Sequence, residues 1–62
     1  MINVRDLLGL VKEDGLYVEV DVTETDFQYV LTVSEAIKSC GGYPIKEIQS
    51  PVDSDTFLRI IV

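Results

Sequence analysis

The chain of 62 residues contains no histidine and no tryptophan, and it has a single cysteine, Cys40. Without histidine it lacks the commonest general base and the commonest zinc ligand. One cysteine can form neither an intrachain disulfide nor a cysteine-only zinc site. We therefore expect no catalytic site, no metal and no cofactor, and we predict that the chain is not an enzyme.

Long hydrophobic runs are also missing. No apolar segment approaches the roughly 18 residues that a membrane-spanning helix needs, and the opening Met1-Ile2-Asn3 lacks the basic-then-apolar plan of a signal peptide. We expect no membrane partner and a cytoplasmic location, where a lone thiol stays reduced. The composition, 47% hydrophobic and 26% charged, is that of a packed globular domain.

Positive charge is scarce, since five basic residues stand against eleven acidic ones and give a net charge of −6. Such a charge repels phosphate backbones, so we expect no nucleic-acid partner. Six acidic residues lie between positions 13 and 26 with no basic residue among them. This stretch is either a solvated edge that keeps the domain soluble or a surface that binds a basic partner protein.

The first part of the chain shows two apolar patterns. After Asn3, a potential helix cap, apolar residues recur at helical spacing, and we predict a short helix with Asp6 in its first turn that Gly15 ends. From position 16 to 22 apolar and polar residues alternate, which predicts a half-buried strand with Glu19 and Asp21 on its wet face.

The remainder predicts one longer helix and two strands. Thr25 and Gln28 form a capping-box pattern at the start of an apolar stripe, so we predict a helix over 25–40 that Gly41-Gly42 ends in a left-handed conformation. Strands are predicted over 43–50, where Pro44 suits a sheet edge or a first position, and over 56–62, central in the sheet or covered on both faces, with a turn between them.

These elements predict a single small α+β domain in the order α-β-α-β-β. We expect a two-layer sandwich of partial ferredoxin-like type with an antiparallel sheet, in which 1–15 is an N-terminal helix and 16–62 forms the β-α-β-β unit. The predicted core consists of Val18, Val20, Val30, Leu31, Ile37, Leu58 and Ile60. A chain this short buries about 60% of its unfolded surface, so we expect association with a second copy to add stability.

The segment 16–62 resembles an ACT domain, in particular the ACT-like segments that follow paired CBS domains. The matching segments are Tyr17-Val18-Glu19-Val20, Ile37-Lys38-Ser39-Cys40-Gly41-Gly42, Ile45-Lys46-Glu47-Ile48 and Leu58-Arg59-Ile60-Ile61-Val62. The resemblance implies a regulatory module that dimerises through its sheet and has a place for a small effector where the first strand meets the next element. The effector-binding candidates at that place are Thr23, Thr25 and Asp26.

Two departures separate the chain from the family pattern. The family's turn at that place has an Asp-x-Pro-Gly-like sequence, whereas positions 23–26 contain neither proline nor glycine. The family also completes its sheet with a fourth strand, which we do not predict here. The missing strand would leave an unpaired edge beside residues 16–22.

A few residues invite a functional interpretation. Tyr17, Glu19 and Asp21 lie on the outward side of the first strand and are the predicted partner-binding residues. Cys40 falls on an apolar stripe at a helix end and is predicted to be buried and inert. Asp53 and Asp55 are explained by turn formation rather than by calcium binding.

The function predicted is a non-catalytic ACT-like regulatory or assembly module that forms a homodimer; the alternative is an acidic module or inhibitor that binds a basic protein.

Overall fold

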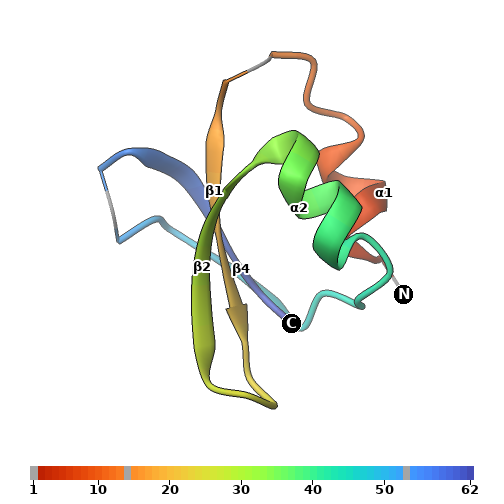
Figure 1. Ribbon diagram of the computed structural model, residues 1–62, viewed down its shortest axis with the longest axis vertical. Helices are drawn as coiled ribbons and strands as arrows, with labels where there is room; N and C mark the ends of the chain where they lie inside the picture. Colours follow the sequence, from red (N-terminus) through yellow and green to blue (C-terminus); the bar gives the residue numbers. More distant parts are fainter. Residues whose placement is uncertain (1, 14, 53) are drawn as a thin grey trace.

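Six elements follow one another in the computed structural model, which describes residues 2–13, 15–52 and 54–62. Figure 1 shows two helices packed beside a twisted sheet. The elements are α1 (Val4–Leu8), β1 (Tyr17–Val22), β2 (Phe27–Thr32), α2 (Val33–Cys40), β3 (Glu47–Gln49) and β4 (Thr56–Ile61). The order is therefore α-β-β-α-β-β, with one strand more than the sequence predicted.

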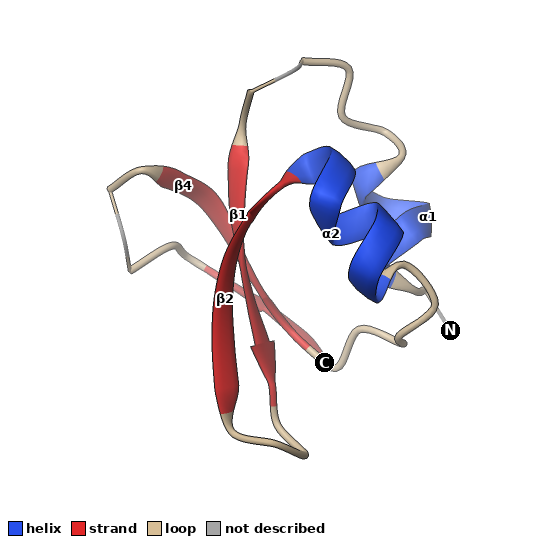
Figure 2. Ribbon diagram, in the orientation of Figure 1, coloured by secondary structure: helices blue, strands red, loops and turns tan. Residues whose placement is uncertain are grey.

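The four strands form one mixed sheet in the order β2-β1-β4-β3. β1 is antiparallel to β2 and parallel to β4, and β4 is antiparallel to β3. Both helices lie on one face of this sheet (Figure 2), which confirms an α+β domain with two layers. The predicted antiparallel sheet is wrong because the chain crosses over through α2 between β2 and β3, which makes β1 and β4 parallel.

The largest error of the sequence interpretation is the helix over 25–40. Its first part is the strand β2, which forms a hairpin with β1 through a turn in which Asp26 adopts a left-handed conformation at φ 58°. The helix starts only at Val33. Thr32 is its N-cap: the side chain of Thr32 accepts from the Glu35 N–H at 3.2 Å, and the Glu35 carboxylate accepts from the Thr32 N–H at 3.0 Å. This reciprocal capping box replaces the predicted one at Thr25.

The N-terminal helix is confirmed at its start and wrong at its end. Asn3 and Asp6 form a capping box, but α1 stops at Leu8 with Gly9 as C-cap, well before Gly15. Its first turn docks onto the end of α2, where the Arg5 N–H donates to the carbonyl of Gly41 at 3.0 Å. Packing against α2 thus satisfies amides that a helix start leaves unpaired.

The end of α2 also differs from the prediction. The helix does end at the glycine pair, but Gly41 has right-handed angles of φ −55° and ψ −32°. Glycine is needed there for space, because a Cβ would lie 2.2 Å from the carbonyl oxygen of Ile37. The strand predicted over 43–50 shortens to Glu47–Gln49 at the sheet edge, and β4 lies in the sheet interior as predicted.

The core lies between the helices and the sheet. Val18, Val20 and Ile60 are fully buried as predicted. The assignment of Val30 to the core is wrong, because 48% of Val30 is exposed. Leu31, Ile37 and Leu58 pack at the margin of the core. The prediction missed residues contributed mainly by the two helices: Val4, Leu8, Val33, Ala36 and Val62. Over the stretches that the structure describes, neither helix is long and apolar enough to cross a membrane.

Candidate protein-interaction edge

The two outer strands of the sheet differ sharply in how they are protected. β3 has three residues, carries Glu47 and is preceded by Lys46. β2 has six residues, Phe-Gln-Tyr-Val-Leu-Thr, with no charge and no proline, and it pairs with β1 without a bulge. Natural edge strands are usually short, charged, bulged or interrupted by proline, because an open edge pairs with other strands. β2 has none of these protections.

Alternation along the hairpin decides which backbone groups of β2 face outward. The N–H of Val33 donates to the carbonyl of Leu16 at 3.1 Å, so this opposed pair is hydrogen-bonded. Opposed pairs alternate between hydrogen-bonded and non-hydrogen-bonded in an antiparallel ladder. Gln28, Val30 and Thr32 are therefore non-hydrogen-bonded to β1, and their N–H and C=O groups point away from it.

The opposite strand agrees with this assignment. The carbonyl of Asp21, which lies across from Gln28, accepts from the Val62 N–H at 2.9 Å and so points away from β2. Of the three outward residues, Thr32 has its N–H engaged by Glu35 in the helix cap. Gln28 and Val30 remain as the residues whose amides and carbonyls are available to an added strand.

Aromatic side chains stand beside this edge on the face that carries the helices. Phe27 is 58% and Tyr29 43% exposed, and their ring centroids lie 6.1 Å apart. Figure 1 shows the hairpin extending beyond α2, and both rings remain about half exposed. They border a hollow of about 430 Å³, which is lined by Val22, Thr25, Phe27, Tyr29, Leu31, Ser39, Cys40 and Tyr43.

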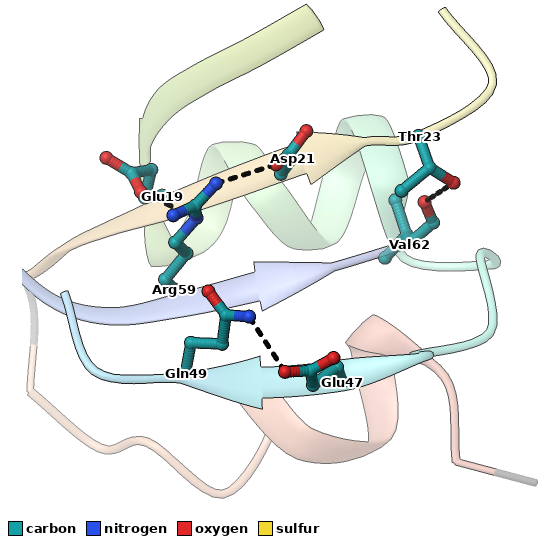
Figure 3. Close-up of polar contacts among 7 residues, drawn as sticks. All are labelled: Glu19, Asp21, Thr23, Glu47, Gln49, Arg59 and Val62. Carbon is teal, nitrogen blue, oxygen red and sulfur yellow. Dashed lines mark hydrogen bonds and ion pairs between the residues drawn. The ribbon is translucent and has the colours of Figure 1, made fainter. Parts of the chain in front are cut away.

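The predicted partner-binding residues lie on the opposite face of the sheet. Figure 3 views this face and shows Arg59 of β4 reaching over Glu19 and Asp21 of β1. The Nη2 of Arg59 donates to Asp21 Oδ2 at 2.8 Å, and its Nε lies 3.1 Å from Glu19 Oε2 at ion-pair distance without hydrogen-bond geometry. Tyr17, on the same strand, is 44% exposed.

The prediction that Glu19 lies on a solvent-exposed face of β1 is therefore wrong, because only 8% of Glu19 is exposed. The reason is that Arg59 lies opposite Glu19 in the parallel register and draws the two carboxylates into an internal ion cluster. The six acidic residues of the stretch 13–26 thus do not form one solvated surface. Asp14 of that stretch and Asp53 of the predicted turn lie outside the described residues.

The effector candidates Thr23, Thr25 and Asp26 are not brought together. Thr23 Oγ1 donates to the carbonyl of Val62 at 2.8 Å (Figure 3) and accepts from Lys46 Nζ at 2.7 Å, so it ties β1 to the end of β4. Thr25 lines the hollow beside β2. Asp26 occupies the left-handed position of the hairpin turn.

Cys40 is buried as predicted, with 7% of its surface exposed, and it is unpaired. Burial raises the pKa of its thiol above the ordinary value, because a thiolate is poorly solvated there. The side chain is thus poorly suited to act as a nucleophile at neutral pH.

Comparisons of the chain with protein-family models, curated proteins and solved structures find no match.

The open edge of β2 was missed in the sequence because its residues were assigned to a helix. A usable signal was present, since Phe27, Tyr29 and Leu31 alternate with Gln28, Val30 and Thr32 and most of the six are aromatic or branched.

Proposed function

We propose that this chain is a non-catalytic assembly module that forms a homodimer by joining the β2 edges of two copies into one continuous sheet. The observation that carries the proposal is the contrast between the two sheet edges: β3 is short and charged, whereas β2 is long, uncharged and regular. Added strands bind such edges through main-chain hydrogen bonds, while neighbouring side chains provide selectivity.

The missing charge on β2 is also what two copies of this chain require. Each copy carries a net charge of −6, so two copies repel one another wherever their acidic residues meet. An uncharged strand allows close approach. Glu19 and Asp21 of the neighbouring strand β1, which lie opposite Val30 and Gln28, are held in ion pairs by Arg59.

The proposal keeps the mode of action that the resemblance to an ACT domain implies, namely dimerisation through the sheet. It moves the joining edge from β1, which lies between β2 and β4, to β2. A small effector belongs to the same proposal only at the hollow that Thr25 borders, because Thr23 is engaged in holding β1 to β4. The alternative of an acidic module for a basic partner has less support, since Arg59 already neutralises two of its acids.

The test compares two variants that add the same charge at the two edges. Val30 on β2 is 48% exposed and Ile48 on β3 is 50% exposed, so Val30→Lys and Ile48→Lys are matched in exposure and in charge change. We expect light scattering over a hundredfold concentration range to show a dimer for the wild type and for Ile48→Lys, and a shift toward monomer for Val30→Lys. A wild type that stays monomeric throughout, or equal weakening by both variants, overturns the proposal.

A further inference from the structure

We infer that the two β2 strands meet in a single register, in which Tyr29 of one copy lies directly opposite Tyr29 of the other. This inference rests on the proposed function and adds the residues that come together. It follows from the positions of Gln28, Val30 and Thr32 on the outer edge and from the symmetry of a dimer.

Symmetry limits the possible registers. Two antiparallel strands side by side are related by a twofold axis perpendicular to the sheet, so each copy turns its helix-bearing face to the same side. Residues that lie opposite one another must then point to the same face, which requires the axis to pass beside a residue and not between two residues. The candidates near the middle of β2 are axes at Gln28, Tyr29 and Val30.

Available backbone groups select among these three. An axis at Tyr29 places Gln28 of each copy opposite Val30 of the other, so the two residues with outward amides and carbonyls bond only to each other. An axis at Val30 pairs Gln28 with Thr32, but the Thr32 N–H already donates to Glu35 at 3.0 Å. An axis at Gln28 pairs Val30 with Asp26, which has φ 58° and lies outside the strand.

The side chains agree with the register centred on Tyr29. On the helix-bearing face it sets Tyr29 beside Tyr29 and Phe27 beside Leu31 of the second copy. All three side chains border the hollow, and Phe27 and Tyr29 are exposed in the single chain. The second copy therefore covers an aromatic surface that is 58% exposed at Phe27 and 43% exposed at Tyr29 in one chain. No charged side chain of either strand lies in this contact.

Single cysteines test the register in a Cys40→Ala background. Opposed residues of a non-hydrogen-bonded pair have Cα atoms about 4.5 Å apart, within the range that a disulfide spans. Two copies of residue 30, or of residue 28, are displaced by two residues along the strands and lie about 8 Å apart, which is too far. We expect Tyr29→Cys to form a covalent dimer under mild oxidation, and Gln28→Cys and Val30→Cys alone to form almost none.

A mixture of Gln28→Cys and Val30→Cys supplies the second measurement, because it keeps Tyr29 and is expected to give the mixed disulfide. The outcomes distinguish the two proposals. A dimer that cross-links at Val30→Cys alone and not in the mixture overturns the register and leaves the β2 interface intact. A chain that stays monomeric, with no cross-link at any of the three positions, overturns the proposed function and the register together.

Discussion

The guanidinium of Arg59 on β4 donates a 2.8 Å hydrogen bond to the carboxylate of Asp21 on the parallel strand β1. The same side chain lies 3.1 Å from Glu19, so one cation serves two carboxylates that are only 10% and 15% exposed. Carboxylates that lose such a partner keep the penalty of burial without the compensating charge.

We expect Arg59→Met to lower the free energy of unfolding by about 1–3 kcal/mol. The matched control is Lys12→Met, which removes the same charge from an exposed position and should change stability by less than about 0.5 kcal/mol. Urea unfolding followed by circular dichroism measures both. Equal midpoints for the two variants would mean that the ion cluster contributes nothing to the fold.

The core prediction concerns two residues that lie opposite one another, Ile60 on β4 and Ile48 on β3. Ile60 is fully buried and Ile48 is 50% exposed. Ile60→Ala should therefore destabilise the domain by about 2–5 kcal/mol, a large share of the stability of so small a domain, while Ile48→Ala should cost under about 1 kcal/mol. Thermal melts of the pair check this, and similar losses from both would place the core elsewhere.

The capping box at the start of α2 predicts a pH dependence. The Thr32 N–H and hydroxyl donate to the Glu35 carboxylate at 3.0 and 3.1 Å, and these bonds lower the pKa of Glu35 from its ordinary value of 4.5. Because the pKa is lower in the folded state, the stabilisation is complete above the unfolded value and is lost as the pH falls through the folded one.

Glu35→Gln keeps the capping geometry but does not titrate. We expect the urea midpoint of the wild type to fall more steeply than that of Glu35→Gln between about pH 5 and pH 3. Other carboxylates titrate in both proteins, so the difference between the two curves isolates Glu35. Parallel curves of urea midpoint against pH would show that the capping box binds the charged and neutral forms of the Glu35 carboxyl equally well.

Cys40 should behave as a small apolar side chain. Its burial and the raised pKa of its thiol predict slow modification of the folded protein at neutral pH, with a rate that rises as urea opens the fold. Cys40→Ala should fold and dimerise at a loss of about 1 kcal/mol. Rapid labelling of the native protein would instead assign the thiol an exposed, reactive environment.

Salt separates the homodimer from an acidic module with a basic partner. Two chains of net charge −6 repel over distances that salt screens, and the β2 contact itself holds no ion pair. We therefore expect the dimer to tighten when ionic strength rises from about 0.02 to 0.3 M. Binding to a basic protein would weaken over the same range, so analytical ultracentrifugation at the two salt concentrations decides between the two functions.

The sequence predicted β1, the cap at Asn3, the glycine end of α2 and the interior position of β4, because each depends on local pattern. It failed at 27–32, where residues spaced as in a helix also alternate as in a strand. Two capping-box patterns compete there, Thr25 with Gln28 and Thr32 with Glu35, and only pairing with β1 decides between them. The ion cluster of Arg59 with Glu19 and Asp21 could not be predicted from local patterns either, because it depends on the register between β1 and β4.

Thr32 is the last residue of β2 and the N-cap of α2, so no linker separates the strand from the helix. The change from strand to helix is therefore completed at a single residue, and the Thr32 N–H is used by the Glu35 carboxylate. The helix cap thus sets how much of the β2 edge an added strand can pair with, and it ends the available edge at Val30.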